Sequence, residues 1–134
     1  MDRLLPVISD LSRPYWEAAR DHRLVLQRCP QCRDWVHPPR PMCPKCQSES
    51  MAYEETSGRG KVYTWSVMYT KGNPGFEDKL PYATVTIELD EQPHLFTIGN
   101  IDCPLGEIEI GLPVEVWYEK MSDEITLPQW RPAK

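Results

Sequence analysis

The chain has 134 residues, enough for one small domain or two very small ones, and it carries a net charge of −5 at pH 7. Hydrophobic residues make up 40% and charged residues 26%, which are ordinary values for a globular protein. No stretch approaches the roughly 18 to 20 consecutive apolar residues that cross a bilayer, and the first twenty residues lack the apolar run of a secretory signal. We therefore expect a cytoplasmic protein that does not insert into a membrane.

The charge changes sign near residue 50. Residues 1–50 contain eight basic and six acidic side chains, whereas residues 51–134 contain seven and fourteen and so carry a net charge of −7. This asymmetry predicts two structural units with different surfaces. The acidic half is a poor surface for nucleic acid, because phosphate binding needs clustered lysines and arginines.

The first half of the chain predicts one short helix followed by three short strands. Ser12 with Pro14 two residues later is typical of a helix start, so we expect Ser12 to cap a helix that fades by Asp21 or His22. The three strands that we expect after it cover residues 23–28, 34–37 and 51–56.

Four of the five cysteines form two C-x-x-C pairs with ten residues between the pairs. They are Cys29, Cys32, Cys43 and Cys46. In a small cytoplasmic chain this spacing is typical of one tetrahedral metal site rather than of disulfides. A tight turn between cysteines three apart directs both thiolates at one ion, and Pro30 and Pro44 fix φ in each turn. Four cysteines without a further ligand predict a closed, structural zinc site, and iron remains possible because it accepts the same four sulfurs.

The fifth cysteine, Cys103, stands alone late in the chain. We interpret it as a small buried apolar residue. The alternative is a catalytic thiol, which would need a histidine beside it, and nothing in the sequence shows that His94 meets it.

The period of the apolar residues changes to two after a turn or hinge at residues 57–60. Five strands are expected, at residues 61–69, 82–89, 94–98, 114–118 and 125–127. Five short strands of which the first is long favour an OB-type barrel. The fold class is therefore mainly β, and we divide the chain into a helical segment, a zinc ribbon and an OB-fold, at residues 1–22, 23–57 and 58–134. In the closing segment, Trp130 either closes the bottom of the barrel or docks on a partner.

Five motifs in order cover most of the chain. They are PYWE at 14–17, LVLQRC at 24–29, PPRPMCP at 38–44, SGRGKVYTW at 57–65 and TLP at 126–128. Together they resemble the DUF35 family over roughly residues 12–132. The resemblance implies an N-terminal helix, a rubredoxin-like zinc ribbon and an OB-fold. One departure is that Arg33 and Gln47 stand where many ribbons have glycine after each C-x-x-C, which implies a slightly different turn but no loss of metal.

The resemblance also implies a function. Family members form complexes with a thiolase or a thiolase-like, lipid-transfer-protein-type enzyme, and help to accommodate an acyl-CoA substrate while the partner holds the catalytic Cys and His residues. We therefore expect a non-catalytic subunit, with acyl-CoA at or near the interface and, by analogy with dimeric thiolases, a two-plus-two heterotetramer. The candidate ligand or partner contacts are Arg40, Arg59, Trp65, Tyr69 and Phe76. Trp65 is equally well explained as barrel core, and the two arginines as solvated side chains.

Two other functions remain open. A zinc ribbon joined to an OB-fold is also common in nucleic-acid-binding modules, although the charge of −7 in the second half argues against this. An independent enzyme that uses Cys103 or a labile metal is the third hypothesis. The chain contains no glycine-rich phosphate loop and no Ser-His-Asp spacing that stands out.

Overall fold

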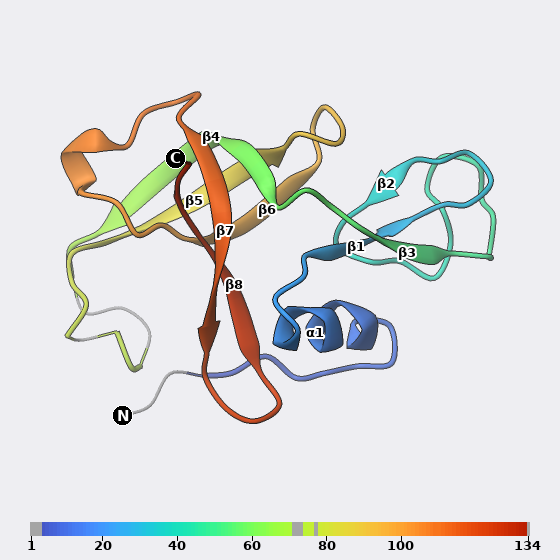
Figure 1. The fold of residues 1–134 in the computed structure, drawn as a ribbon, viewed down its shortest axis with the longest axis horizontal. Coiled ribbons are helices and arrows are strands. Elements are labelled where there is room, and N and C mark those ends of the chain that lie inside the picture. The colour runs from blue at the N-terminus through green and yellow to red at the C-terminus, as the bar shows by residue number, and fades with distance from the viewer. Residues whose placement is uncertain (1–3, 71–73, 77, 134) are drawn as a thin grey trace.

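The computed structural model describes residues 4–70, 74–76 and 78–133, and it contains one short helix and two antiparallel sheets (Figure 1). The helix α1 covers Arg13–Arg20. The smaller sheet has the order β2-β1-β3, with β1 at Val25–Arg28, β2 at Trp35–Val36 and β3 at Ala52–Glu55. The larger sheet has the order β6-β5-β4-β7-β8. Its strands are β4 at Arg59–Met68, β5 at Tyr82–Leu89, β6 at Phe96–Asn100, β7 at Pro113–Lys120 and β8 at Thr126–Pro132, and a 3-10 turn, η1, covers Leu105–Glu107.

The helix lies where the sequence predicts it, and Ser12 occupies the predicted N-cap position, but its side chain makes no capping hydrogen bond. Ser12 has φ −90° and ψ −8°, which is helical, whereas a capping serine is normally extended so that its hydroxyl can turn back onto the first turn. The Ser12 hydroxyl instead accepts a hydrogen bond from the Ser9 backbone N–H at 3.0 Å. At the other end, the Asp21 N–H donates to the Ala18 carbonyl, and His22 has a left-handed φ of +59°. The helix therefore ends where the sequence indicates.

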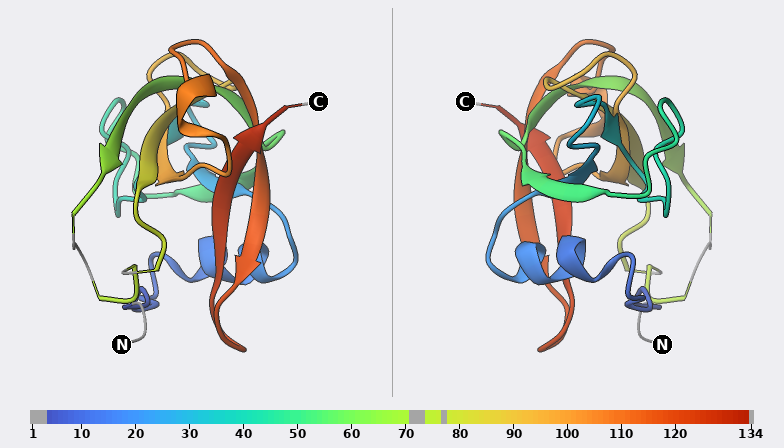
Figure 2. Two further views of the ribbon diagram at one scale, coloured as in Figure 1. Left: turned by 90° about the vertical axis from the view of Figure 1, so that its left-hand side faces the viewer. Right: turned by 90° about the vertical axis from the view of Figure 1, so that its right-hand side faces the viewer.

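The larger sheet is a nearly closed barrel, which confirms the predicted mainly β, OB-type fold. The long strand β4 has a register shift between Val62 and Thr64. It pairs with β5 from Gly60 to Met68 and with β7 at its beginning. A parallel bridge between Ile101 and Trp130 brings the end of β6 to β8. Figure 2 shows the sheet curling around, with the β7–β8 hairpin extending beside α1. His22, just after α1, stacks on Tyr118 of β7 with ring centroids 4.8 Å apart.

Two local predictions need correction. The turn or hinge predicted at residues 57–60 is shorter than expected. The chain bends at Gly58, which has φ +73°, but β4 already begins at Arg59, and Gly60 pairs with both Leu89 and Val114. A Cβ on Gly60 would lie 2.5 Å from the Glu88 carbonyl oxygen, so this glycine permits close strand packing. The last strand is also longer than predicted, since two prolines occur within β8 rather than beyond it.

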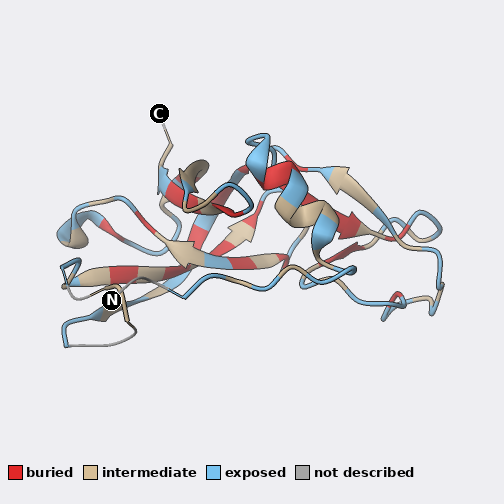
Figure 3. Ribbon diagram, turned by 90° about the horizontal axis from the view of Figure 1, so that it is seen from below, coloured by how far each residue is buried: buried red, intermediate tan, exposed pale blue. Residues whose placement is uncertain are grey.

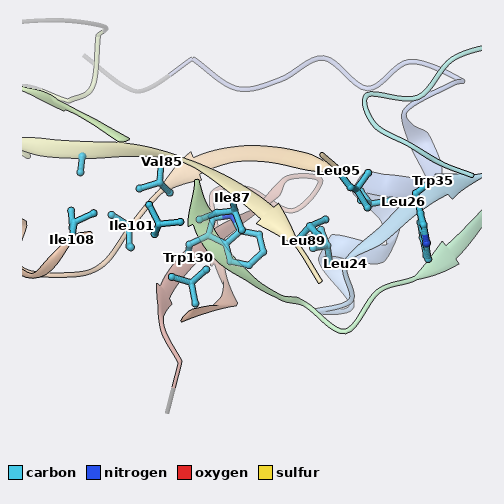
Figure 4. Packing of buried hydrophobic residues seen from close by; sticks show 13 residues of the cluster. Leu24, Leu26, Trp35, Val85, Ile87, Leu89, Leu95, Ile101, Ile108 and Trp130 are labelled. Atoms are coloured by element: carbon cyan, nitrogen blue, oxygen red, sulfur yellow. The ribbon is translucent and has the colours of Figure 1, made fainter. Parts of the chain in front are cut away.

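The apolar core runs without a break from the small sheet into the barrel. Leu24, Leu26 and Trp35 from the small sheet are buried in the same cluster as Leu89 and Leu95 of the barrel (Figure 4). Along β5, every second residue from Ala83 to Leu89 is buried. Figure 3 shows that the segment before α1 and the cysteine loops are mostly exposed. The small sheet therefore obtains its buried surface from the barrel.

A glutamine side chain fixes the contact between the two sheets. Gln92, in the turn between β5 and β6, accepts a hydrogen bond from the Trp35 N–H at 3.0 Å and donates one to the Trp35 carbonyl at 3.2 Å. Its amide therefore pairs with β2 as a neighbouring strand would. Gln27, which is 2% exposed, pairs in the same way with both backbone groups of Arg40, at 2.8 and 2.7 Å.

Replacing Gln92 with alanine tests this contact. The change leaves a buried N–H and a carbonyl of Trp35 without these partners, so we expect the free energy of unfolding to fall by about 2 kcal/mol. Urea denaturation of the metal-loaded chain measures it. The exposed Gln31→Ala is the control and should change stability by less than ~0.5 kcal/mol. Equal stability of the two variants would show that Gln92 does not fasten the sheets together.

Candidate metal centre

The four predicted ligands come together at the tips of two loops of the small sheet. The Sγ atoms of Cys29 and Cys46 are 3.6 Å apart, as are those of Cys32 and Cys43, and all four lie within 4.8 Å of one another. Four sulfurs placed about 2.3 Å from a central ion at tetrahedral angles would be separated by about 3.8 Å. The donor set and its spacing therefore fit a tetrahedral metal ion of the zinc or iron type.

The two loops have the same backbone hydrogen bonds. In the first loop, the Cys29 N–H donates to the Asp34 carbonyl at 2.9 Å, and the Arg33 N–H donates to the Cys29 carbonyl at 2.8 Å. In the second loop, Cys43 and Gln47 repeat this pattern, and both of its hydrogen bonds measure 2.9 Å. Each loop therefore holds its pair of cysteines in place through its own main chain.

Backbone N–H groups also stabilise the thiolate form of the first cysteine in each loop. The N–H of Cys32 lowers the pKa of the Cys29 thiol to about 6, against the opposing effect of burial. The N–H of Cys46 likewise lowers the pKa of Cys43 below its ordinary value. Burial and neighbouring cysteine side chains instead raise the pKa of Cys32 and Cys46. Without a metal, therefore, only the first cysteine of each loop is favoured as the thiolate, which is the form that ligates a metal.

The residue after each C-x-x-C pair has a left-handed backbone. Arg33 has φ +65° and Gln47 has φ +62°, a region that favours glycine. Both positions therefore adopt the backbone that glycine would favour, and the two side chains are accommodated at some cost in energy.

A charged cluster braces the first loop against β3. Glu54 of β3 accepts hydrogen bonds from Arg28 and Arg33, both at 2.9 Å, and these two arginines lower its pKa. Arg28 also donates from Nε to the Arg33 carbonyl at 2.8 Å, and its guanidinium lies 4.6 Å from the centre of the Trp35 ring. In this way Arg33 gains interactions that offset its strained backbone, and the first cysteine loop is tied to the core of the small sheet.

Two of the five predicted ligand or partner contacts, Arg59 and Trp65, lie on β4, and the other three lie outside the strands. Arg40 is exposed in the loop that Gln27 holds, and Arg59 is exposed at the start of β4. Tyr69, just beyond β4, is 71% exposed, whereas Trp65 is half-buried and packs against the barrel core, as its alternative explanation predicts. The roles of these five residues in binding stay predictions.

The fifth of these residues, Phe76, lines a cavity that the sequence analysis missed. This cavity, which we name the seam cavity, has a volume of about 380 Å³ and lies beside the bridge between β6 and β8. Its walls include Phe76, Tyr82, Asn100, Asp102, Trp117 and Glu119. These residues come from four separate parts of the chain, so only the curvature of the barrel brings them together.

The metal centre and the barrel together define a class of protein: a four-cysteine ribbon joined to an OB-fold. Residues 16–52 match the family model of the ChsH2 rubredoxin-like zinc ribbon domain, and residues 53–119 match that of the ChsH2 C-terminal OB-fold domain. A DUF35 domain-containing scaffold protein from Methanocaldococcus jannaschii is 34% identical over 102 residues, which cover 75% of this chain and 71% of that protein. The chain belongs to the DUF35 family.

Two further relatives extend the comparison. A solved structure titled "Ltp2-ChsH2(DUF35) aldolase" includes a chain that superimposes with a TM-score of 0.85 at 36% identity, covering 96% of this chain and 98% of that one. A probable enoyl-CoA hydratase alpha subunit from Thermomonospora curvata is 38% identical over 128 residues. That match covers 96% of this chain but 39% of the hydratase subunit, so the chain spans about two-fifths of the length of this relative. Among the residues that the structure describes, no helix is long and apolar enough to cross a membrane.

The left-handed residue in the second loop yields a prediction. Gln47→Gly removes the steric cost of φ +62°, and we expect it to stabilise the metal-loaded protein by about 0.5–1 kcal/mol. Gln47→Val should destabilise it, because a β-branched side chain tolerates this backbone poorly. Urea denaturation at constant metal concentration measures both. Loss of stability in the glycine variant would mean that the Gln47 side chain has a favourable role that outweighs the strain.

Proposed function

We propose that this chain is a non-catalytic subunit that binds a thiolase-like enzyme and supports its reaction on acyl-CoA thioesters. The observation that carries the proposal is the end-to-end likeness to the chain in the structure titled "Ltp2-ChsH2(DUF35) aldolase". The names of other relatives, a hydratase alpha subunit and scaffold proteins, support an accessory role in acyl-CoA chemistry. The hydratase activity itself is not carried over, because most of that relative lies outside the match.

The chemistry of the chain itself agrees with an accessory role. Four cysteines face one another, so an ion bound there would be enclosed by sulfur and would serve to hold the two loops together. Burial raises the pKa of the Cys103 thiol, and the carboxylates of Glu107 and Asp102 act in the same direction. A thiol with a raised pKa is a poor nucleophile at neutral pH. The catalytic groups are therefore expected on the partner.

Several finer features belong to this proposal. The complex is a two-plus-two heterotetramer in the cytoplasm, with the acyl-CoA at or near the interface between the subunits. The bound metal is zinc, which the match to a zinc ribbon domain supports. The chain divides at residues 22 and 57 into a helical segment, a ribbon and a barrel, and these three units together would bind the partner enzyme.

Affinity purification from the native host tests the proposal. The tagged chain should retain a thiolase-like protein in nearly equal amount, identified by mass spectrometry, and the complex should cleave or form acyl-CoA thioesters that neither component converts alone. A Cys103→Ser chain should support the same activity, because its thiol takes no part. Recovery of the chain alone, or with nucleic acid, would contradict the proposal and favour a nucleic-acid-binding module.

Metal analysis tests the identity of the ion. Protein purified without added metal should contain about one zinc per chain, and Cys46→Ser should lose most of it and unfold at lower temperature, because one of four ligands is gone. Cys103→Ser is the matched control and should keep its full metal content. Elemental analysis and thermal denaturation measure both effects. If the protein instead contains one iron per chain and absorbs visible light as an iron–thiolate complex does, the metal of the site is iron and not zinc.

A further inference from the structure

The seam cavity lies at the end of the barrel away from the metal centre. In Figure 4, Ile101, which lines the cavity, is at the opposite end of the labelled core from Leu24 and Trp35. The cavity opens where the barrel closes through the parallel bridge between Ile101 and Trp130. A ligand there would contact the barrel and not the cysteine loops, so the metal does not explain this cavity.

Aromatic rings form much of its wall, and the chain already holds them in place. Phe76 stacks on Tyr82 with ring centroids 4.9 Å apart. The indole N–H of Trp117 donates to the Trp130 carbonyl at 3.1 Å, which fixes the ring against the last strand. Rings that are fixed before a ligand arrives lose little conformational entropy on binding.

The polar part of the wall is acidic. Glu119 and Asp102 contribute carboxylates, and Lys79 contributes a cation, so these three side chains sum to one negative charge. Glu119 accepts a hydrogen bond from Gln129 at 3.2 Å, and Gln129 in turn accepts one from the Asn100 N–H at 2.9 Å. The Glu119 carboxylate is therefore positioned by two neighbouring strands. Asp102 is exposed, so it lies nearer to solvent.

We propose that the seam cavity binds an arginine side chain presented by the partner subunit, an inference that rests on the proposed function. A guanidinium stacks on aromatic rings and pairs with carboxylates, and both kinds of group line this cavity. Arginine, tyrosine and tryptophan are also the residues that most often anchor protein interfaces. The net charge of −7 over residues 51–134 attracts a basic partner surface. The phosphates of coenzyme A are a poorer match, because they would meet the carboxylates of Asp102 and Glu119.

The chemistry of the cavity can be tested on the chain alone by NMR. Adding N-acetyl-arginine amide to the ¹⁵N-labelled chain should shift the indole N–H resonance of Trp117 in a saturable way, with the resonance assigned by Trp117→Phe. The neutral isostere N-acetyl-citrulline amide should bind at least about fivefold more weakly, since it lacks the charge. No shift with the arginine compound, equal binding of citrulline, or a shift caused by propionyl-CoA instead would each overturn the inference.

Charge variants locate the binding within the cavity. Glu119→Gln keeps an oxygen for the Gln129 hydrogen bond but removes the charge, and we expect about tenfold weaker arginine binding. Asp102→Asn is a second variant that does not touch this hydrogen bond and should weaken binding in the same direction. Asp123→Asn removes the same charge from an exposed residue between β7 and β8, so it should bind arginine like the unmodified chain. Thermal denaturation confirms that all three are folded. Unchanged binding in both cavity variants would overturn the assignment.

The purified complex separates this inference from the proposed function. If a thiolase-like partner binds and Glu119→Gln weakens the complex about tenfold while Asp123→Asn does not, both are supported. If the partner binds all variants equally, the proposed function stands and the inference is wrong. If no such partner co-purifies, the proposed function fails, and so does the statement that a partner supplies the arginine. Saturable binding of N-acetyl-arginine amide at Trp117 would still establish an arginine-binding cavity in that case.

Discussion

The small sheet depends on the barrel for its buried surface, and this dependence organises the whole molecule. Its strand β2 has two residues and β1 and β3 have four each, which is too little to enclose a core of their own. Leu24 and Leu26 are nevertheless 3% and 0% exposed, because the barrel covers them through Leu89 and Leu95. The two ends of the ribbon are thus held in different ways: the shared core orients it at one end, and an ion bound by the four cysteines would close the loops at the other.

Glutamine side chains form hydrogen bonds with the main chain of segments that are distant in the sequence. Gln92 pairs with the main chain of Trp35, and Gln27 with that of Arg40, each through one donor and one acceptor. At the seam between β6 and β8, Gln129, which is 5% exposed, accepts the Asn100 N–H. A neutral amide can satisfy both a donor and an acceptor in the interior without the desolvation cost of a buried ion pair. The ion pair of Arg23 with Glu55, by contrast, lies on the surface.

The features that the sequence predicted are those with local signals. The cysteine spacing indicated the four-sulfur cluster, and the period-two patterns indicated the strands of the barrel. The length of β8 was missed because Pro128 is typical of a strand end, although it lies inside this strand, which continues to Pro132. The clamp of Gln92 on Trp35 joins residues 57 positions apart and leaves no local pattern. The seam cavity was missed for the same reason, since it exists only once β6 and β8 meet.

A scaffold protein binds best when its contact surfaces are already held in one relative position. Any conformational freedom between these surfaces is lost when a partner binds, and this loss weakens the affinity. Here the shared core and the Gln92 clamp hold the ribbon against the barrel before binding, and the metal-binding loops are braced by Glu54 through two arginines. The excess of basic residues in the first half and of acidic residues in the second half gives the two units different charges, and under the proposed function a partner would meet them as one preformed surface. A preformed arrangement of this kind is what the proposed accessory role would require, because a subunit that is already rigid loses little conformational freedom when it binds.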